Sequence, residues 1–200
     1  MRFRQGEVEE ANPAITAEAL DDVRQVQLAL LDPAAFAPLY LQYRSQVYRL
    51  CYRAAGNAID AEDLTSQVFH KTLARLDAFR GGSFDRWIVT VAVNTIRDFH
   101  RTRRWHTPLP DLRADPAPGP EEEAIRSDDR ALLHALLATL PDDQREVVLL
   151  RLSGYSGAEI AELLGRSPEA VRKAQERAVK HMARRIDLSD NEAHGEGGAR

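Results

Sequence analysis

The sequence predicts an all-α protein with two helical domains joined by a proline-rich linker, and three observations support this fold class. Apolar residues recur at three- and four-residue steps through two long stretches, which is the period of an amphipathic helix. Aromatic residues make up only 6% of the 200 residues, and few runs alternate as half-buried strands do. Five prolines lie within residues 107–120, and neither a helix nor a central strand accommodates them.

These patterns also set the boundaries of the segments. We expect an N-terminal extension at 1–32, a first helical domain at 33–106, an acidic proline-rich linker at 107–123, a second helical domain at 124–186 and a disordered tail at 187–200. The extension contains a further helix, Ala17 to Leu31. Residues 36–106 carry eleven basic and six acidic side chains, whereas residues 107–130 carry three basic and seven acidic ones. The net charge of the whole chain is −4, but the charges are unevenly spread, with a basic first domain next to an acidic linker.

Three helices are expected in the first domain. The first has one apolar face, formed by Phe36, Leu39, Tyr40, Tyr43, Val47, Leu50 and Cys51. Asp60 is expected to N-cap the second helix, which runs to about Leu76. The buried stripe of that helix consists of Leu64, Val68, Phe69 and either Leu73 or Leu76. After a loop at 79–83, Ser83 caps a long third helix, whose stripe consists of Phe84, Trp87, Ile88, Val91, Ala92, Thr95 and Phe99.

The second domain begins with two leucine-rich helices separated by Pro141. Their apolar residues are Leu132, Leu133, Leu136, Leu137 and Leu140 in one, and Val147, Val148, Leu149 and Leu152 in the other. Ser156 and Glu159 then have the spacing of a capping box at the start of a short helix. After a turn at 165–167, Ser167 caps the last helix and Pro168 takes its first position. That helix is expected to bury Val171, Ala174, Ala178 and Met182.

The stretch from Ser156 to Arg185 is a short helix, a tight glycine-containing turn and a longer helix. This is the sequence shape of a DNA-binding helix-turn-helix. The second helix would expose Glu169, Arg172, Lys173, Glu176, Arg177 and Lys180. Arg and Lys side chains reach guanine edges or phosphates. The alternative is an ordinary helical hairpin with a solvated basic face.

The helix that begins near Phe84 ends in a cluster of arginines, at 97, 101, 103 and 104. Such a basic helix end suits a strand of nucleic acid, because arginines bind the phosphates. The alternative is a core helix whose terminal cations interact with the helix dipole. Trp87 falls on the apolar stripe, so we expect it in the core and not stacked on a base.

Several function classes find no support in the sequence. The six histidines lack metal-ligand spacing, and the chain has no G-x-S-x-G motif and no P-loop. The acidic residues at 60–63 are interpreted as first-turn carboxylates of a helix. We therefore expect no catalytic residues, no metal and no cofactor. One cysteine, Cys51, excludes an intrachain disulfide. No run approaches the roughly 18 apolar residues of a membrane span, and no secretory signal is visible, so a cytoplasmic protein is expected.

Two sets of motifs, in order, resemble the sigma factors of bacterial RNA polymerase, and among them the extracytoplasmic-function (ECF) group. The motifs that resemble region 2 are Asp60-Ala61-Glu62-Asp63-Leu64, Val68-Phe69, Phe79-Arg80-Gly81-Gly82-Ser83-Phe84, Trp87-Ile88 and Ala92-Val93-Asn94. The motifs that resemble region 4 are Leu140-Pro141, Arg145-Glu146-Val147-Val148, Gly154-Tyr155-Ser156-Gly157-Ala158-Glu159-Ile160-Ala161, Leu164-Gly165-Arg166-Ser167 and Ala170-Val171-Arg172. The resemblance covers residues 33–105 and 130–185, with a short linker and no region 3 between them.

The resemblance implies a role for each group of residues. Contact with the β′ clamp helices of core polymerase is implied for Asp63, Ser66, Gln67 and His70. Opening and reading of the −10 element is implied for Asp77, Arg80, Gly81, Gly82, Ser83, Arg86, Asn94, Arg97, Arg101, Arg103 and Arg104. Reading of the −35 duplex is implied for Arg166, Ser167, Glu169, Arg172, Lys173, Glu176, Arg177 and Lys180. The first helices of region 4 would meet the β flap, and an anti-sigma factor is a further candidate partner.

The sequence departs from the family pattern in two places and leaves two other functions open. Ser66-Gln67 stands where many members carry Gln-Glu, which removes one carboxylate from the expected clamp contact, and Val93 replaces a common basic residue. The runner-up function is a helix-turn-helix regulator that binds duplex DNA without polymerase. A third is a protein-interaction module such as an anti-sigma decoy. A plain regulator needs no second basic helix beside a glycine-rich loop, and this feature favours the sigma factor.

Overall fold

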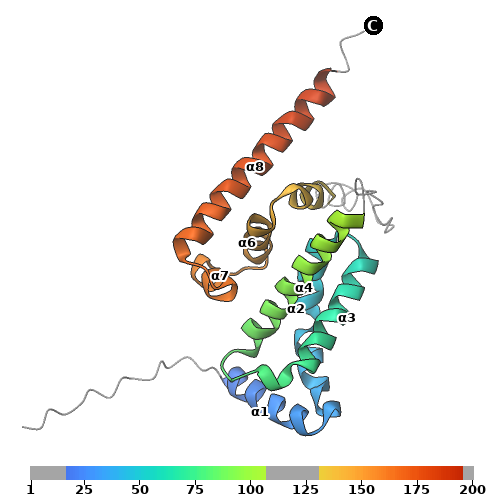
Figure 1. Cartoon of the computed structure of the whole chain (residues 1–200), viewed down its shortest axis with the longest axis vertical. Helices are drawn as coiled ribbons and strands as arrows, with labels where there is room; N and C mark the ends of the chain where they lie inside the picture. Colours follow the sequence, from blue (N-terminus) through green and yellow to red (C-terminus); the bar gives the residue numbers. More distant parts are fainter. Residues whose placement is uncertain (1–16, 107–130, 196–200) are drawn as a thin grey trace, which may run out of the picture.

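The computed structural model describes residues 17–106 and 131–195, and these are helical throughout apart from short turns (Figure 1). The all-α prediction is confirmed. The elements are α1 (Ala17–Leu31), η1 (Pro33–Phe36), α2 (Ala37–Ala55), α3 (Ala58–Ala74), η2 (Leu76–Ala78), α4 (Phe84–His106), a helical segment at 131–139, α6 (Asp142–Leu152), α7 (Gly157–Leu164) and α8 (Pro168–Gly195). We call residues 17–106 the N-terminal block and residues 131–195 the C-terminal block. The predicted linker lies outside the described residues.

In the N-terminal block, α2, α3 and α4 pack around one core, and α1 lies across the end of this bundle (Figure 1). Val47, Leu64 and Ile88, one from each bundle helix, are at most 1% exposed. The helix predicted at Ala17 to Leu31 is α1. It is joined to the bundle by a buried hydrogen bond in which the Tyr43 hydroxyl donates to the Asp22 carboxylate.

The structure corrects the predicted cap of α3. The N-cap is Asn57, whose side-chain oxygen accepts from the backbone N–H of Asp60 at 2.8 Å. Asp60 instead lies in the first turn, where its carboxylate accepts a hydrogen bond from the Asn57 amide at 2.8 Å. Asn and Asp are both good N-cap residues, and Asn57 is the N-cap because the helix begins at Ala58. Of the two candidate leucines, Leu76 is buried and Leu73 is 39% exposed.

In the C-terminal block, α6, α7 and α8 pack on one another with the turn geometry of a helix-turn-helix. The capping box of α7 is confirmed: Ser156 Oγ accepts from the Glu159 N–H, and the Glu159 carboxylate accepts from the Ser156 N–H at 2.8 Å. Gly165 ends α7 with a positive φ of 62°, which lets the chain turn directly into α8. Ser167 caps α8 through the N–H of Ala170, as expected.

Several finer expectations for the cores and the tail are wrong. Leu132 and Leu152 are 47% and 41% exposed, and Tyr40 is 37% exposed, so these three leave the predicted stripes. Helix α8 continues to Gly195, whereas the expected second domain ends at residue 186 and is followed by a disordered tail. Residues 187–194 contain no proline and no glycine, so none of them breaks the helix.

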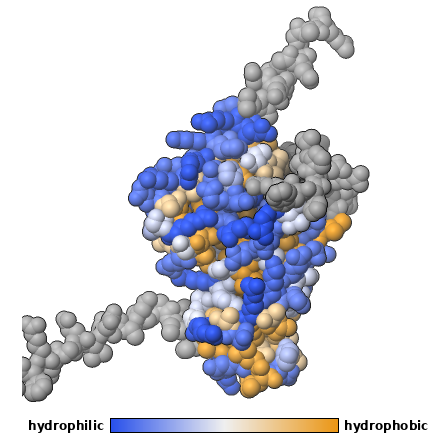
Figure 2. Space-filling view, in the orientation of Figure 1, coloured by the Kyte–Doolittle hydropathy of each residue, from blue (hydrophilic) through white to orange (hydrophobic). Residues whose placement is uncertain are grey.

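Exposed apolar side chains gather at the end of the molecule formed by α1, the lower end in Figure 2. Leu28, Leu30 and Leu31 are 44%, 49% and 87% exposed. The described helices include none with the length and apolar character needed to cross a membrane.

Candidate nucleic-acid and polymerase interfaces

The four residues predicted to contact polymerase share one face of α3. Asp63, Ser66, Gln67 and His70 are all exposed. Gln67 Nε2 donates to Asp63 Oδ2 at 2.7 Å, which holds the carboxylate in place on the helix surface. Ser66 Oγ donates back to the Glu62 carbonyl and adds no charge. Asp63 is thus the one anionic group of this four-residue face.

The loop before α4 is open and glycine-dependent. Gly81 and Gly82 have φ angles of 92° and 86°, a region that side chains rarely adopt, and a Cβ at either position would meet no neighbour within 4 Å. Arg80 donates to the Asp77 carbonyl, which bends its side chain over the loop. Ser83 Oγ accepts from the Arg86 N–H at 3.3 Å and caps α4, as expected. The loop leaves its backbone accessible beside the arginines of α4.

Along α4, the predicted DNA-binding residues line the polar side. Arg97 Nη1 donates to Asn94 Oδ1 at 3.0 Å, and Arg101 pairs with Asp98 at 3.0 Å. Arg103 and Arg104 belong to the last turns of α4, but their side chains lie outside the described residues. Trp87 is half-buried.

The ring of Trp87 packs against Phe79 and Phe84, with centroids 5.6 Å and 5.5 Å away. This agrees with its interpretation as a core residue.

The helix-turn-helix presents its charged face on α8. Glu169, Arg172, Lys173, Glu176, Arg177 and Lys180 are all exposed. Neighbouring charges pair along the helix, Arg172 with Glu176, and Lys173 with Glu169 at 2.8 Å. These exposed pairs contribute little free energy, about 0.3–0.5 kcal/mol each, so a phosphate can compete for the cations. The predicted face is formed by one continuous helix.

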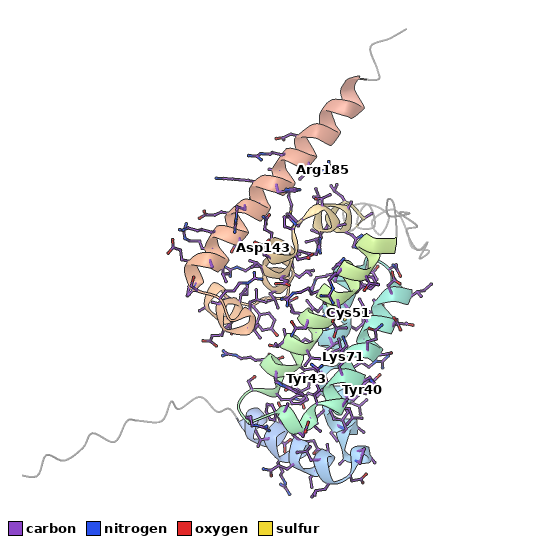
Figure 3. The ribbon with its side chains drawn as sticks, in the orientation of Figure 1. Tyr40, Tyr43, Cys51, Lys71, Asp143 and Arg185 are labelled. Atoms are coloured by element: carbon purple, nitrogen blue, oxygen red, sulfur yellow. The ribbon has the colours of Figure 1, made fainter. Side chains whose placement is uncertain are left out.

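Further along the same helix, sequence reasoning missed two more basic residues. Arg184 and Arg185 are exposed, and in Figure 3 Arg185 lies on the part of α8 that extends away from the N-terminal block. A four-residue step from Lys180 would have indicated Arg184, and Arg185 follows it directly. Arg177 lies 3.6 Å from Asp143, a residue of α6 that Figure 3 also labels.

Arg166 and Ser167, the two predicted −35 residues in the turn, already have partners within the C-terminal block. Arg166 Nη2 donates to Glu146 Oε2 at 2.8 Å, and its Nη1 donates to the Asp143 carbonyl at 3.1 Å. The Ser167 hydroxyl caps α8. Both therefore set the angle at which α8 leaves α7, whatever else they contact.

Contacts between the two blocks pair two of the predicted −10 arginines with glutamates, which sequence reasoning did not predict. Arg97 donates through Nε to Glu146 Oε1, and this hydrogen bond raises the pKa of Arg97 above its usual value. Arg86 pairs with Glu162. No local sequence pattern indicates such pairs, because each depends on how the blocks dock.

Two family models match the chain, each over one block. The model described as Sigma-70 region 2 matches residues 39–106, and the model described as Sigma-70, region 4 matches residues 130–182.

Curated relatives extend the similarity across both blocks. The ECF RNA polymerase sigma factor BldN of Streptomyces coelicolor is 35% identical over 84% of this chain and 66% of its own length. ShbA of Streptomyces griseus is 36% identical over 72% of this chain and 80% of its own length. SigD of Mycobacterium tuberculosis is 30% identical over 86% of this chain and 87% of its own length. The chain thus spans about two thirds of BldN and most of the other two.

Two solved structures share the arrangement of the helices. CnrH, solved in complex with the cytosolic domain of CnrY, has a TM-score of 0.62 and 25% identity, covering 84% of this chain and 97% of that one. The sigma factor RpoE of Bartonella quintana, solved with the anti-sigma factor NepR, has a TM-score of 0.58 and 20% identity, covering 76% and 97%. The second likeness concerns the fold alone.

Proposed function

The chain belongs to the ECF RNA polymerase sigma factors, which are not enzymes but direct promoter-specific transcription initiation, and from this premise we propose how its two blocks divide that work. The N-terminal block docks on core polymerase and opens the −10 element, while the C-terminal block reads the −35 element as duplex. The observation that carries the proposal is the presence of both family regions in order, each with an exposed basic helix. A helix-turn-helix regulator acting alone would need only the second.

For the polymerase contact, we assign the face of α3 formed by Asp63, Ser66, Gln67 and His70. Support comes from its exposure and from the Gln67–Asp63 hydrogen bond, which presents a fixed carboxylate to a basic partner. The partner would be the β′ clamp helices. With a single anionic group on these four residues, shape and neutral hydrogen bonds would carry much of this contact.

For the −10 element, we assign the glycine-rich loop at 79–83 and the polar side of α4. Opening a duplex requires that a base be held outside the stack while phosphates are neutralised. The loop offers accessible backbone with Arg80 and Arg86 at its ends, and Arg97 and Arg101 supply further cations along α4. Most of their contacts would be with phosphates, which position the strand without reading its sequence.

For the −35 element, we assign the exposed face of α8 to the major groove. A recognition helix reads base edges with residues near its N-terminus, and here these are Glu169, Arg172 and Lys173. Arg177 and Lys180, a turn further on, suit the phosphate backbone. The paired carboxylates of Glu169 and Glu176 orient the cations until DNA replaces them.

Two further assignments follow from the family. CnrH was solved with the cytosolic domain of CnrY, and RpoE with an anti-sigma factor. We propose that this chain too has an anti-sigma partner and that it works in the cytoplasm, where core polymerase is found.

In vitro transcription tests the proposed function. Purified chain and core polymerase are incubated with a library of genomic fragments, and the transcripts are sequenced. Transcripts that share a −10 and a −35 element, and that require the added chain, support the proposal. DNA binding by the chain without any gain in transcription supports the regulator that acts without polymerase.

A further inference from the structure

The two blocks of the free chain are docked on each other through charges of opposite sign. The N-terminal block supplies arginines from α4, and the C-terminal block supplies glutamates from α6 and α7. Arg86 pairs with Glu162 and lies 3.9 Å from Glu159. Elsewhere between the blocks, Arg53 Nη1 donates to Ser153 Oγ at 3.2 Å. The interface is thus electrostatically complementary.

Glu146 is the most buried charged group of this interface. Its side chain is 6% exposed, and its two oxygens accept hydrogen bonds from two different arginines. Arg97 comes from the N-terminal block and Arg166 from the C-terminal block. A buried carboxylate with both oxygens satisfied by guanidinium groups is well held, because removing either partner leaves charge without compensation.

A close packing contact accompanies the ion pairs. The segment at 131–139 lies against the end of α2, where His134 Nε2 is 3.3 Å from the Ala54 carbonyl. At Gly56, with a φ of 80°, an added Cβ would overlap the imidazole ring of His134. Buried apolar residues of both blocks form one continuous core. The docked arrangement is therefore specific and not a loose encounter.

This arrangement is incompatible with reading both promoter elements at once. The labels −10 and −35 place the two elements about 25 base pairs apart, which is about 85 Å of straight duplex at roughly 3.4 Å per base pair. In the structure, α7 packs directly on α4, and α8 follows α7 after a three-residue turn. The 24 residues at 107–130 would reach about 80 Å when fully extended. Separation of the blocks is thus both required and permitted.

We propose that Glu146 and Glu162 form a clasp that holds the free chain closed by occupying Arg97 and Arg86 of the N-terminal block, while Glu146 also occupies Arg166 within its own block. These three arginines belong to the proposed DNA-binding surfaces, so the consequence for DNA rests on the proposed function. While the clasp is closed, no phosphate can take the place of the glutamates on these arginines. Core polymerase opens the clasp by binding the two blocks at separate positions.

The direct test measures the shape of the full chain without DNA or polymerase. Small-angle X-ray scattering gives the radius of gyration of the wild type at 0.1 M and 0.5 M salt. One double variant, Arg86→Gln with Arg97→Gln, removes the clasp from the N-terminal side, and another, Glu146→Gln with Glu162→Gln, removes it from the C-terminal side. The matched control, Asp98→Asn with Asp143→Asn, removes one carboxylate of an intrablock pair from each block.

The clasp predicts a compact wild type that expands as salt rises, and expansion at 0.1 M salt in both clasp variants but not in the control. An unchanged radius of gyration in both variants would overturn it. Expansion confined to the Glu146 variant would overturn it too, because the loss would then come from the Glu146–Arg166 pair inside the C-terminal block.

A second measurement separates the clasp from the proposed function. The Glu146→Gln, Glu162→Gln variant should bind a −35 duplex about fivefold or more tightly than the wild type in the absence of polymerase. Expansion without any gain in DNA affinity would support the clasp and contradict the assignment of Arg166 and α8 to DNA.

Discussion

Gln46 Nε2 of α2 donates to the hydroxyl of Tyr155, at 2.9 Å, and so joins residues 109 positions apart in the sequence and in different blocks. The same Nε2 lies 2.6 Å from Asp85 Oδ1, and the Tyr155 hydroxyl donates to the other oxygen of Asp85 at 3.3 Å. Burial, with the negative charge of Asp85, raises the pKa of Tyr155 above its usual value, so the phenol stays protonated. The three side chains form a closed polar network between α2, α4 and the loop before α7.

The first prediction concerns this network. Tyr155→Phe should destabilise the folded chain by about 1 kcal/mol, since one intramolecular hydrogen-bonding group is lost while Gln46 keeps Asp85. Thermal or urea unfolding measures the change. Tyr40→Phe, which alters an exposed tyrosine of α2 outside the network, is the control and should have a smaller effect. Equal effects of the two substitutions would contradict the network's contribution.

The second prediction concerns core polymerase. Asp63→Arg should weaken binding of the chain to core polymerase, because it replaces the anionic group of the α3 face by a cation and removes the acceptor of Gln67. Asp63 is exposed, so the circular dichroism spectrum and the unfolding midpoint should stay close to those of the wild type. A pull-down with core polymerase measures the affinity. Unchanged affinity would remove the interface from this face of α3.

The third prediction concerns the recognition helix. Replacing Arg172, Lys173 and Arg177 by alanine should abolish specific binding to the −35 duplex, since a base-reading arginine typically contributes about 1–3 kcal/mol. Single variants separate the roles: a base contact relaxes specificity at one position, whereas a phosphate contact weakens binding to all sequences alike. Arg151→Ala, on α6, is the matched control. A triple variant that still directs transcription would refute the assignment of α8.

The fourth prediction concerns pH. Burial raises the pKa of Asp22 above its usual value, although the hydrogen bond from Tyr43 opposes this. The folded state therefore binds the proton more readily than the unfolded state, and Asp22 lowers stability as pH rises from below 3.8 through the raised pKa. Asp22→Asn keeps an acceptor for Tyr43 and should remove this dependence, with stability at pH 7 equal to or above that of the wild type.

Urea unfolding at pH 4 and pH 7 provides the measurement. Asp21→Asn, at the exposed neighbouring position, removes a smaller contribution to the raised pKa of Asp22 and should leave most of the pH dependence in place. A loss of stability in Asp22→Asn that is larger at pH 7 than at pH 4 would contradict this prediction, because the ionised carboxylate would then stabilise the fold.

What the sequence predicts well is local. Ser83, Ser156 and Ser167 were identified as caps because a cap is recognised from the few residues that follow it. Asp60 was misassigned because Asn57, three positions earlier, is an equally good cap and only the start of the helix decides between them. The partners of Arg97 and Arg166 could not be predicted, since Glu146 meets them only when α4, α6 and the turn before α8 come together.

The acidic linker and tails lead to a separate prediction: in the free chain they lie across the basic faces and suppress DNA binding, an effect distinct from the clasp. The linker lies outside the described residues, so this idea stays a prediction. Its test compares the full chain with the fragment 131–186 on −35 duplex at two salt concentrations. Equal affinities at both concentrations would leave the linker as a spacer.

The most direct measurement of the central claim is transcription by core polymerase and this chain from a single promoter whose two elements are altered separately. If the N-terminal block opens the −10 element and the C-terminal block reads the −35 element, base changes in either element should abolish the transcript, and lengthening the spacer by a few base pairs should reduce it sharply. A transcript that survives changes in the −10 element, or that tolerates any spacer length, would contradict the division of work between the two blocks.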